Sequence, residues 1–164
     1  MRLITVILAM SFGFATTVAT AAPEVGKAPP DFTLPNRTGH NVKLSDLRGK
    51  VVLINFWASF CEPCAEELPA LDKLQTQYRP AGFALAAVNI DPTPSDANKM
   101  LDKLQLKFEA LYDTNRWTAR DYGIRTMPFT LILDRAGLVR HVHAGYASGA
   151  EKKYEAEIQK LLKK

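Results

Sequence analysis

The stretch from Val51 to Trp57 (VVLINFW) restricts the fold more than any other, because all but one of its residues are apolar. Such a run, rich in β-branched residues, is typical of a strand that is buried on both faces of a sheet. A helical pattern follows from Cys61 to about Tyr78, and a second buried run extends from Phe83 to Ile90. The order strand, helix, strand predicts that the two strands pair in parallel.

The flanking segments predict an α/β domain with a mixed central sheet, helices on its faces and an N-terminal β-hairpin extension. The hairpin comprises Phe32–Leu34 and Asn41–Leu44 around a turn-forming Pro-Asn-Arg-Thr-Gly segment. The other predicted elements are a capped turn at Ser45–Gly49, a helix at Ser95–Leu104, a short strand at Leu111 and Tyr112, a helix at Thr114–Tyr122, paired strands at Phe129–Leu133 and Leu138–Val142, and a last helix opened by the capping box Ser148–Glu151.

The length and the net charge of the chain limit the number of domains and the kinds of partner. The chain has 164 residues, which suggests a single domain. Its formal net charge of +4 is mild, and only the last helix gathers basic residues, where they oppose the negative end of the helix dipole. A nucleic-acid-binding protein would show a basic stripe with a recognisable motif. We therefore expect no nucleic-acid partner.

The first 21 residues resemble an export signal. Arg2 precedes an apolar stretch from Leu3 to Val18, and Ala19-Thr20-Ala21 supplies the small-x-small pattern of a cleavage site. We predict cleavage near Ala21 and Ala22, which leaves residues 22–164 as one mature domain. The alternative is an uncleaved membrane anchor, although the stretch is shorter than the roughly 20 apolar residues that span a bilayer.

The two cysteines of the chain, Cys61 and Cys64, form a Cys-Glu-Pro-Cys motif between the first buried strand and the helix. Unpaired N–H groups and the dipole at a helix N-terminus stabilise an anion, and a thiolate is the form that attacks a disulfide. Cys64 follows by nearly one helical turn, so its sulfur can reach back to Cys61. One cysteine can therefore attack a target and the other can release it.

Two simpler explanations of the cysteines fit less well. In the chain-entropy model, a bridge that closes a four-residue loop contributes only about 1.9 kcal/mol, which makes it a weak structural staple. A structural zinc site usually has four ligands, and the sequence contains no second Cys-x-x-Cys and no His-x-x-x-His. We therefore predict a redox-active disulfide, with no metal and no other cofactor.

The sequence resembles the exported TlpA/ResA-like branch of the thioredoxin-like fold over about residues 24 to 162, which implies that residues 22–164 form a thioredoxin-like domain. The resemblance is carried by Leu44–Lys50 running into Val51–Trp57, by the Cys-Glu-Pro-Cys motif with the residues up to Pro69, and by Gly123–Pro128 with the strand that follows. It implies a thiol–disulfide oxidoreductase, in a branch that includes reductants of cytochrome c maturation.

The resemblance implies a role for individual residues. Cys61 is the expected attacking thiolate, Cys64 is the more buried resolving thiol, and the two form the disulfide. Pro128 matches the cis-proline of the family, which lies against the disulfide and contacts the substrate chain. The other expected substrate contacts are Trp57, Phe60, Glu62, Pro63 and Met127, although core packing is an equal alternative for Trp57.

The proton acceptor for Cys64 is not obvious from the sequence. Asn55 occupies the position of the buried aspartate of thioredoxin, and a neutral amide cannot take a proton from a thiol. Asp91 is the candidate acid–base group, because it follows the strand Phe83–Ile90 at the edge where α/β sheets place their sites. A turn residue before Pro92 is the simpler alternative for Asp91.

Charge around the motif indicates the direction of electron flow. Glu62 lies between the cysteines, and Glu66 and Glu67 follow within two turns. These residues suit the helix dipole but disfavour a second anion at Cys61, and a protein that stabilises its reduced form weakly is a reductant. We therefore expect an exported, periplasmic reductant of protein disulfides, in cytochrome c maturation or in repair, recharged by a membrane thiol donor of the DsbD/CcdA type.

Two other functions are carried as alternatives. A peroxiredoxin-like thiol peroxidase shares the Ser-Asp-Leu-Arg-Gly-Lys entry, but it would have Thr where this chain has Ala58. A copper-binding delivery protein could use both cysteines with a histidine, since soft thiolates suit Cu(I). His141 and His143 share one face of a strand, but a polar strand face is their commoner meaning, and His40 is expected to be solvated.

Overall fold

A computed structural model describes residues 22–164, and the predicted export signal at residues 1–21 lies outside the described residues. The centre of the fold is a five-stranded sheet with the strand order β5-β4-β3-β6-β7. Its strands are β3 (Val51–Trp57), β4 (Phe83–Asn89), β5 (Ala110–Tyr112), β6 (Phe129–Leu133) and β7 (Val139–Ala144). The thioredoxin-like fold and its mixed central sheet are as predicted.

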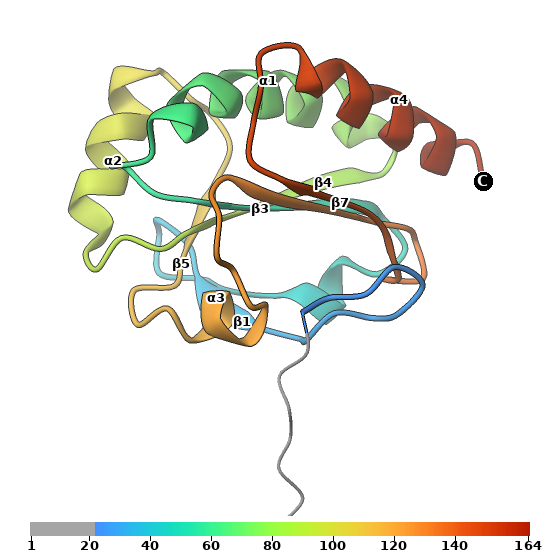
Figure 1. The fold of residues 1–164 in the computed structure, drawn as a ribbon, viewed down its shortest axis with the longest axis horizontal. Helices are drawn as coiled ribbons and strands as arrows, with labels where there is room; N and C mark the ends of the chain where they lie inside the picture. The colour runs from blue at the N-terminus through green and yellow to red at the C-terminus, as the bar shows by residue number, and fades with distance from the viewer. Residues whose placement is uncertain (1–21) are drawn as a thin grey trace, which may run out of the picture.

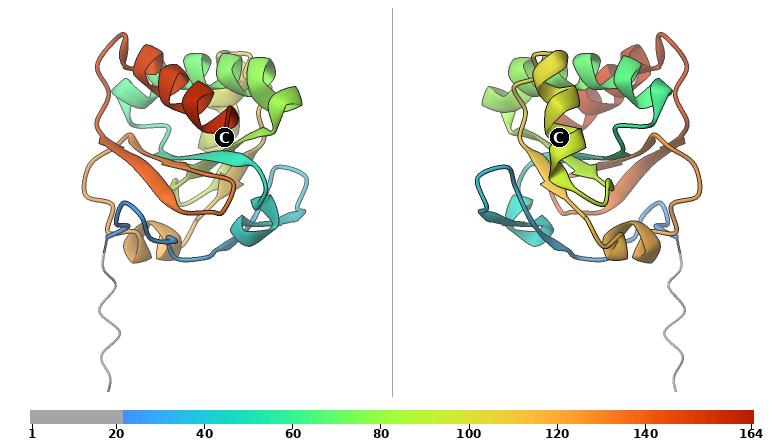
Figure 2. Two further views of the ribbon diagram at one scale, coloured as in Figure 1. Left: turned by 90° about the vertical axis from the view of Figure 1, so that its right-hand side faces the viewer. Right: turned by 90° about the vertical axis from the view of Figure 1, so that its left-hand side faces the viewer.

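Helices cover both faces of this sheet (Figures 1 and 2). Helices α1 (Glu62–Tyr78) and α4 (Ala150–Leu162) lie side by side on the upper face, with α2 (Pro94–Lys103) at one end. The short helix α3 (Trp117–Asp121) lies on the lower face together with the hairpin of β1 (Thr33–Pro35) and β2 (Asn41–Lys43). Two 3-10 helices, η1 (Leu44–Leu47) and η2 (Arg79–Ala81), complete the domain.

Strand β3 is the central element, and all seven of its residues are buried. It pairs in parallel with β4 and antiparallel with β6. Alternate side chains face opposite sides of the sheet. Phe56 faces downward onto the Tyr122 ring at a centroid distance of 5.0 Å, whereas Asn55 faces upward toward α1, where its amide contacts Glu67. One polar residue of the central strand is therefore directed at the first helix.

Two helix boundaries differ from those predicted. The helix expected at Thr114–Tyr122 begins only at Trp117, because the Asp113 carboxylate accepts hydrogen bonds from the Thr118 and Ala119 N–H groups and holds the preceding residues in a turn. The predicted capping box of α4 is wrong, because α4 begins after Gly149 in a left-handed conformation without a side-chain cap. Glu151 instead accepts a hydrogen bond from the Tyr146 hydroxyl.

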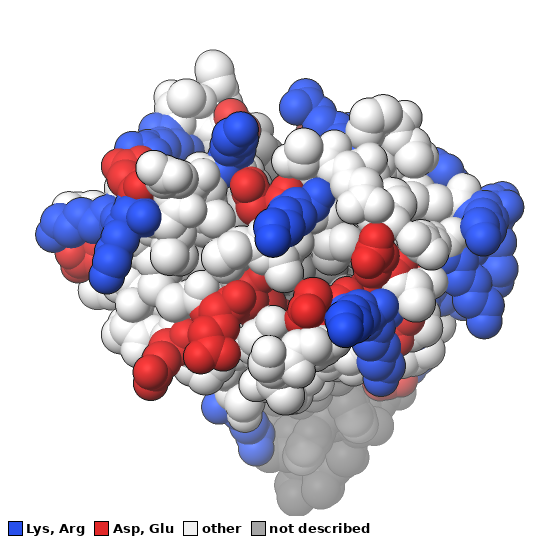
Figure 3. Space-filling model, turned by 90° about the horizontal axis from the view of Figure 1, so that it is seen from above, with Lys and Arg blue, Asp and Glu red and all other residues white. Residues whose placement is uncertain are grey.

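Charged side chains of both signs are interspersed with uncharged ones on the face that carries α1 and α4 (Figure 3). Across residues 22–164, the structure contains no helix with the length and apolarity needed to cross a bilayer. The membrane-anchor alternative concerns the N-terminal residues that precede this range.

Candidate active site

The cysteine pair lies at the N-terminus of α1, where β3 delivers the chain. Cys61 is the N-cap residue, and its sulfur accepts a hydrogen bond from the Cys64 backbone N–H at 3.3 Å. Cys61 and Cys64 form a disulfide. Cys61 is 8% exposed and Cys64 is 0% exposed. Of the two cysteines, only Cys61 keeps any exposed surface.

Asp91 fixes the loop that leads into the cysteine motif. Its carboxylate accepts hydrogen bonds from the Ser59 N–H at 3.0 Å, from the Ser59 hydroxyl at 3.2 Å and from the Asn89 side-chain amide at 2.8 Å. Within residues 22–164, the structure shows no hydrogen bond between Asp91 and either cysteine. The observed contacts of Asp91 hold the backbone just before Cys61, and its proposed part in proton transfer stays a prediction.

The loop before β6 completes the site. The Met127–Pro128 peptide bond is cis, as the resemblance implied. Pro128 is buried and Met127 is partly exposed, whereas the other predicted contacts Phe60, Glu62 and Pro63 are exposed. Trp57 is an exception, because it is 0% exposed. Its indole belongs to the core and offers no surface to a substrate.

Glu67 is a buried residue of the site, and its burial is not evident from the sequence. It follows Cys64 by three residues on α1 and is 0% exposed. Its carboxylate accepts hydrogen bonds from the Asn55 amide at 2.7 Å and from the Thr130 hydroxyl at 3.3 Å. Burial raises the pKa of Glu67 to about 7, against hydrogen bonds that lower it. A carboxyl group with this pKa can accept or release a proton near neutral pH.

Two signals in the sequence could have revealed Glu67. It stands three positions after Cys64 and one before Leu68, so it lies on the helix face that is buried on the sheet. Asn55 is the single polar residue of β3 and directs its amide at that face. Buried polar groups are normally hydrogen-bonded, so an amide in the central strand implied a polar partner on the helix above it.

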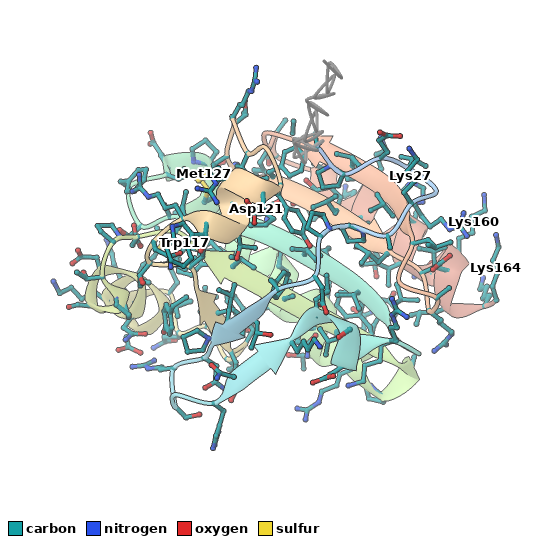
Figure 4. All side chains as sticks on the ribbon, turned by 90° about the horizontal axis from the view of Figure 1, so that it is seen from below. Lys27, Trp117, Asp121, Met127, Lys160 and Lys164 are labelled. Carbon is teal, nitrogen blue, oxygen red and sulfur yellow. A yellow bond between two sulfur atoms is a disulfide. The ribbon has the colours of Figure 1, made fainter. Side chains whose placement is uncertain are left out.

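Trp117 is a second residue of this region that the sequence did not indicate. It is 62% exposed, and Phe60 is 63% exposed. The preceding residue, Arg116, has a left-handed backbone (φ 59°), and its guanidinium donates to the Ile90 carbonyl at the end of β4. Trp117 and Met127 both lie at the end of the molecule where β3 passes into α1 (Figures 1 and 4).

The three histidines contact residues other than the cysteines. His141 and His143 both contact Glu157 of α4, and His40 contacts Thr38 in the hairpin loop. Among residues 22–164, no cluster of three or more His, Cys, Asp or Glu side chains has an arrangement suited to a metal ion. Ala58, where a peroxiredoxin would have a threonine, is buried and has no hydroxyl to offer.

A cysteine pair of this spacing, with one slightly exposed and one fully buried cysteine on a thioredoxin-like fold, defines a thiol–disulfide oxidoreductase. The chain belongs to the AhpC/TSA family, whose model matches residues 25–142.

Individual relatives agree with this class. The chain is 35% identical over 136 residues to the thioredoxin-like protein YneN of Bacillus subtilis, and the aligned region covers 81% of this chain and 79% of YneN. It is 33% identical over 124 residues to the thiol-disulfide oxidoreductase ResA of Geobacillus kaustophilus, and the aligned region covers 76% of this chain and 71% of ResA. A crystal structure from Chlorobium tepidum, provisionally described as a thiol:disulfide interchange protein DsbE, has a TM-score of 0.82 and 38% identity over 86% of this chain and 99% of that chain.

Proposed function

We propose that the protein is an exported reductant of protein disulfides, which uses Cys61 as the nucleophile, Cys64 as the resolving thiol and Glu67 as the proton acceptor. The observation that carries this proposal is the burial of Cys64 one helical turn before a buried carboxyl group whose pKa is raised to about 7. The resolving thiol would be inert without a base, because burial in apolar surroundings disfavours a thiolate.

The reaction begins when the Cys61 thiolate attacks one sulfur of a client disulfide. A Cys61–client bond forms, the client S–S bond breaks, and the second client sulfur leaves as a thiolate. Cys64 then transfers its proton to the Glu67 carboxylate and attacks the Cys61 sulfur. The Cys61–client bond breaks as the Cys61–Cys64 disulfide forms, and the two client thiolates take up protons from the solvent. The client leaves as a dithiol, so two electrons pass from the protein to the client.

The acidic residues around the motif favour this direction. Glu62 and Glu66 are exposed on the first turns of α1, where their charges oppose a thiolate at Cys61. A less stabilised thiolate makes the dithiol form a better electron donor. A membrane thiol donor of the DsbD/CcdA type would then reduce the oxidised protein again on the periplasmic side. An apocytochrome c awaiting haem attachment or a damaged exported protein are the clients that fit this chemistry.

The client is proposed to lie across Phe60, Met127 and Pro128, with Trp117 extending the contact. Phe60 and Trp117 are held on connected loops, since Arg116 donates to the Ile90 carbonyl and the next residue, Asp91, accepts from Ser59. Exposed aromatic side chains in fixed positions are typical of the residues that dominate protein recognition.

Replacing Trp117 by alanine is expected to raise KM for a protein disulfide about fivefold or more and to leave kcat nearly unchanged. The reason is that the ring would contact the client but not the reacting sulfurs. Val25, which is 63% exposed, provides the control Val25→Ala. Steady-state rates with a disulfide-bonded protein and with oxidised glutathione check this, and an equal loss with both substrates would remove Trp117 from the client surface.

A Cys64→Ala variant tests the proposed function. The first attack would proceed, but no resolving thiol would release the client, so mixed disulfides through Cys61 should accumulate. The variant is expressed with its export segment, the exported fraction is trapped by acid and alkylation, and bound clients are identified by mass spectrometry. A Cys61→Ala, Cys64→Ala double variant is the control. Equal labelling of both variants would contradict the proposal.

A further inference from the structure

Arg135, in the turn between β6 and β7, brings together four segments at one end of the molecule. Its guanidinium donates to the Gly49 carbonyl, before β3, at 2.8 Å. It also donates to the carbonyls of Ala81 in η2 and Leu162 in α4, at 3.4 Å and 3.3 Å. Six exposed basic residues stand on the segments that Arg135 contacts, and we call them the basic end: Arg48, Lys50, Arg79, Lys160, Lys163 and Lys164.

The basic end and the client surface lie at opposite ends of the domain. Lys160 and Lys164 lie at one end of the view in Figure 4, and Trp117 and Met127 lie toward the other. In Figure 3, Lys and Arg side chains gather at the right-hand edge, toward which α4 runs in Figure 1. The topology gives the reason, because β3 starts at the basic end and reaches Cys61 only after its far end. A partner bound to the basic end would therefore leave the cysteine motif free.

The helix dipoles explain only part of this arrangement. Lys160, in the last turn of α4, and Arg79, at the end of α1, lie near the negative ends of their helices. Arg48 and Lys50 belong to neither helix. The chain has 21 Lys and Arg against 17 Asp and Glu, so the 15 basic residues that remain without these six are fewer than the acidic ones. The positive net charge of the chain therefore comes from the basic end.

Nearby acidic residues leave most of this charge uncompensated. Asp134, in the β6–β7 turn, is paired with Arg140 at 2.6 Å. Glu155, further back on α4, accepts a hydrogen bond from a tyrosine hydroxyl of α1. Asp46, on η1, is exposed and offsets one of the six charges. Within residues 22–164, the ion pairs closer than 4.0 Å include none of the six basic residues, so they are available to an anionic partner.

The composition of the basic end fits a layer of phosphate groups better than a protein partner. Protein interfaces centre on aromatic and apolar side chains that become buried on binding. None of the large apolar side chains that residues 22–164 expose lies on the segments of the basic end. They are Val25, Phe60, Trp117 and Val142.

The basic end also borders an open hollow of about 280 Å³, between the β6–β7 turn and the end of α4. Three basic side chains line it together with the paired Asp134 and two apolar residues: Arg135, Arg140, Lys164, Ala136 and Leu161. Arginine and lysine are the side chains that bind phosphate groups. The hollow is therefore suited to a single lipid headgroup, with the lysines of α4 contacting its neighbours.

We propose that the basic end docks the protein on an anionic phospholipid surface, with the redox site directed away from the bilayer. Clustered lysines and arginines are attracted by the surface potential of such a bilayer. The export signal predicted at residues 1–21 would deliver the chain to the outer side of a membrane. Docking does not use the cysteines, so it can be tested separately from the proposed function.

Co-sedimentation with vesicles tests this proposal. The exported protein is mixed with vesicles of phosphatidylglycerol and phosphatidylcholine in equal parts, and with vesicles of phosphatidylcholine alone. We expect at least about tenfold stronger partition onto the anionic vesicles. The difference should vanish when NaCl is raised from about 0.1 M to 1 M, because the Debye length falls from about 10 Å to about 3 Å. An uncleaved apolar segment would bind both kinds of vesicle, so the ratio between them isolates the basic end.

Neutralising the three lysines at the end of α4 together should weaken partition onto the anionic vesicles about tenfold or more; the changes are Lys160→Gln, Lys163→Gln and Lys164→Gln. The matched control removes the same net charge from exposed positions elsewhere and should change partition by less than about twofold; its changes are Lys73→Gln, Lys103→Gln and Lys107→Gln. Both triple variants should reduce protein disulfides in solution at the wild-type rate.

Equal partition onto the two kinds of vesicle would overturn the inference, as would an equal loss in both triple variants. Binding to soluble polyglutamate without binding to the anionic vesicles would assign the basic end to an acidic protein and would also overturn it. A Cys61→Ser variant should bind the vesicles as the wild type does while it loses disulfide reduction. Failure of the docking proposal is therefore distinguishable from failure of the proposed function.

Discussion

Replacing Cys61 by serine is expected to abolish reduction of protein disulfides, with a loss of at least about a hundredfold in initial rate. A hydroxyl at the start of α1 is not ionised near neutral pH, so the group that must attack the client sulfur is missing. Cys64 cannot substitute for it, because its sulfur is 0% exposed. The rate is measured with a disulfide-bonded protein as substrate, while excess dithiol keeps the enzyme in its reduced form.

The control for this experiment is Cys64→Ser, which retains the nucleophile. It should form the mixed disulfide as fast as the wild type and then stop. A Cys61→Ser variant that reduces its client at the wild-type rate would show that Cys61 is not the nucleophile. Circular dichroism should show that both variants are folded, as expected for isosteric changes in an ordered loop and helix.

Replacing Glu67 by glutamine is expected to slow the resolving step about 10- to 100-fold at pH 8, because the buried thiol then has no adjacent base. In the wild type, the rate should fall as pH decreases through about 7, where Glu67 becomes protonated, and this acid limb should disappear in Glu67→Gln. Rapid-quench kinetics with alkylation separates the resolving step from the first attack.

Asp91→Asn is the matched control, since it also neutralises a buried carboxylate of the site. Its amide oxygen can still accept a hydrogen bond from the Ser59 N–H, as the carboxylate does now. We expect the acid limb near pH 7 to persist in this variant. The opposite result, a limb that vanishes in Asp91→Asn and persists in Glu67→Gln, would return the proton-accepting role to Asp91.

The same Glu67→Gln change should make the protein more stable at alkaline pH. The pKa of Glu67 rises from 4.5 in the unfolded chain to about 7 in the folded one, so the folded state binds the proton more tightly. Its stability is then complete below about pH 4.5 and declines as pH rises through 7, by about 3 kcal/mol in total. Urea unfolding at pH 5 and pH 8.5 should show a gain for Glu67→Gln only at the higher pH. No gain at pH 8.5 would show that Glu67 is not a destabilised buried carboxylate.

The fold and the sulfur chemistry could be predicted from the sequence because they depend on strong, local signals. The apolar run Val51–Trp57 could hardly be anything but a central strand, and all of it is buried in β3. A Cys-x-x-Cys pair directly after that strand had to lie at the N-terminus of the next helix.

The features that were missed depend on packing between distant segments. Glu67 follows Glu66 in the second turn of α1, where acidic residues ordinarily face solvent and interact favourably with the helix dipole. Its burial is apparent only when Asn55 of β3 and Thr130 of β6 are placed beneath it. The capping box failed for a related reason, because Tyr146 binds Glu151 and the backbone enters α4 through Gly149.

The most direct test of the account is the redox equilibrium of the Cys61–Cys64 pair. The purified domain is equilibrated with defined ratios of reduced and oxidised glutathione, and the dithiol and disulfide forms are separated by alkylation and mass spectrometry. The account predicts a fully reversible two-electron transition at a potential well below the value of about −120 mV that characterises strongly oxidising dithiol proteins. A potential near that value, or a disulfide that does not exchange with glutathione, would contradict it.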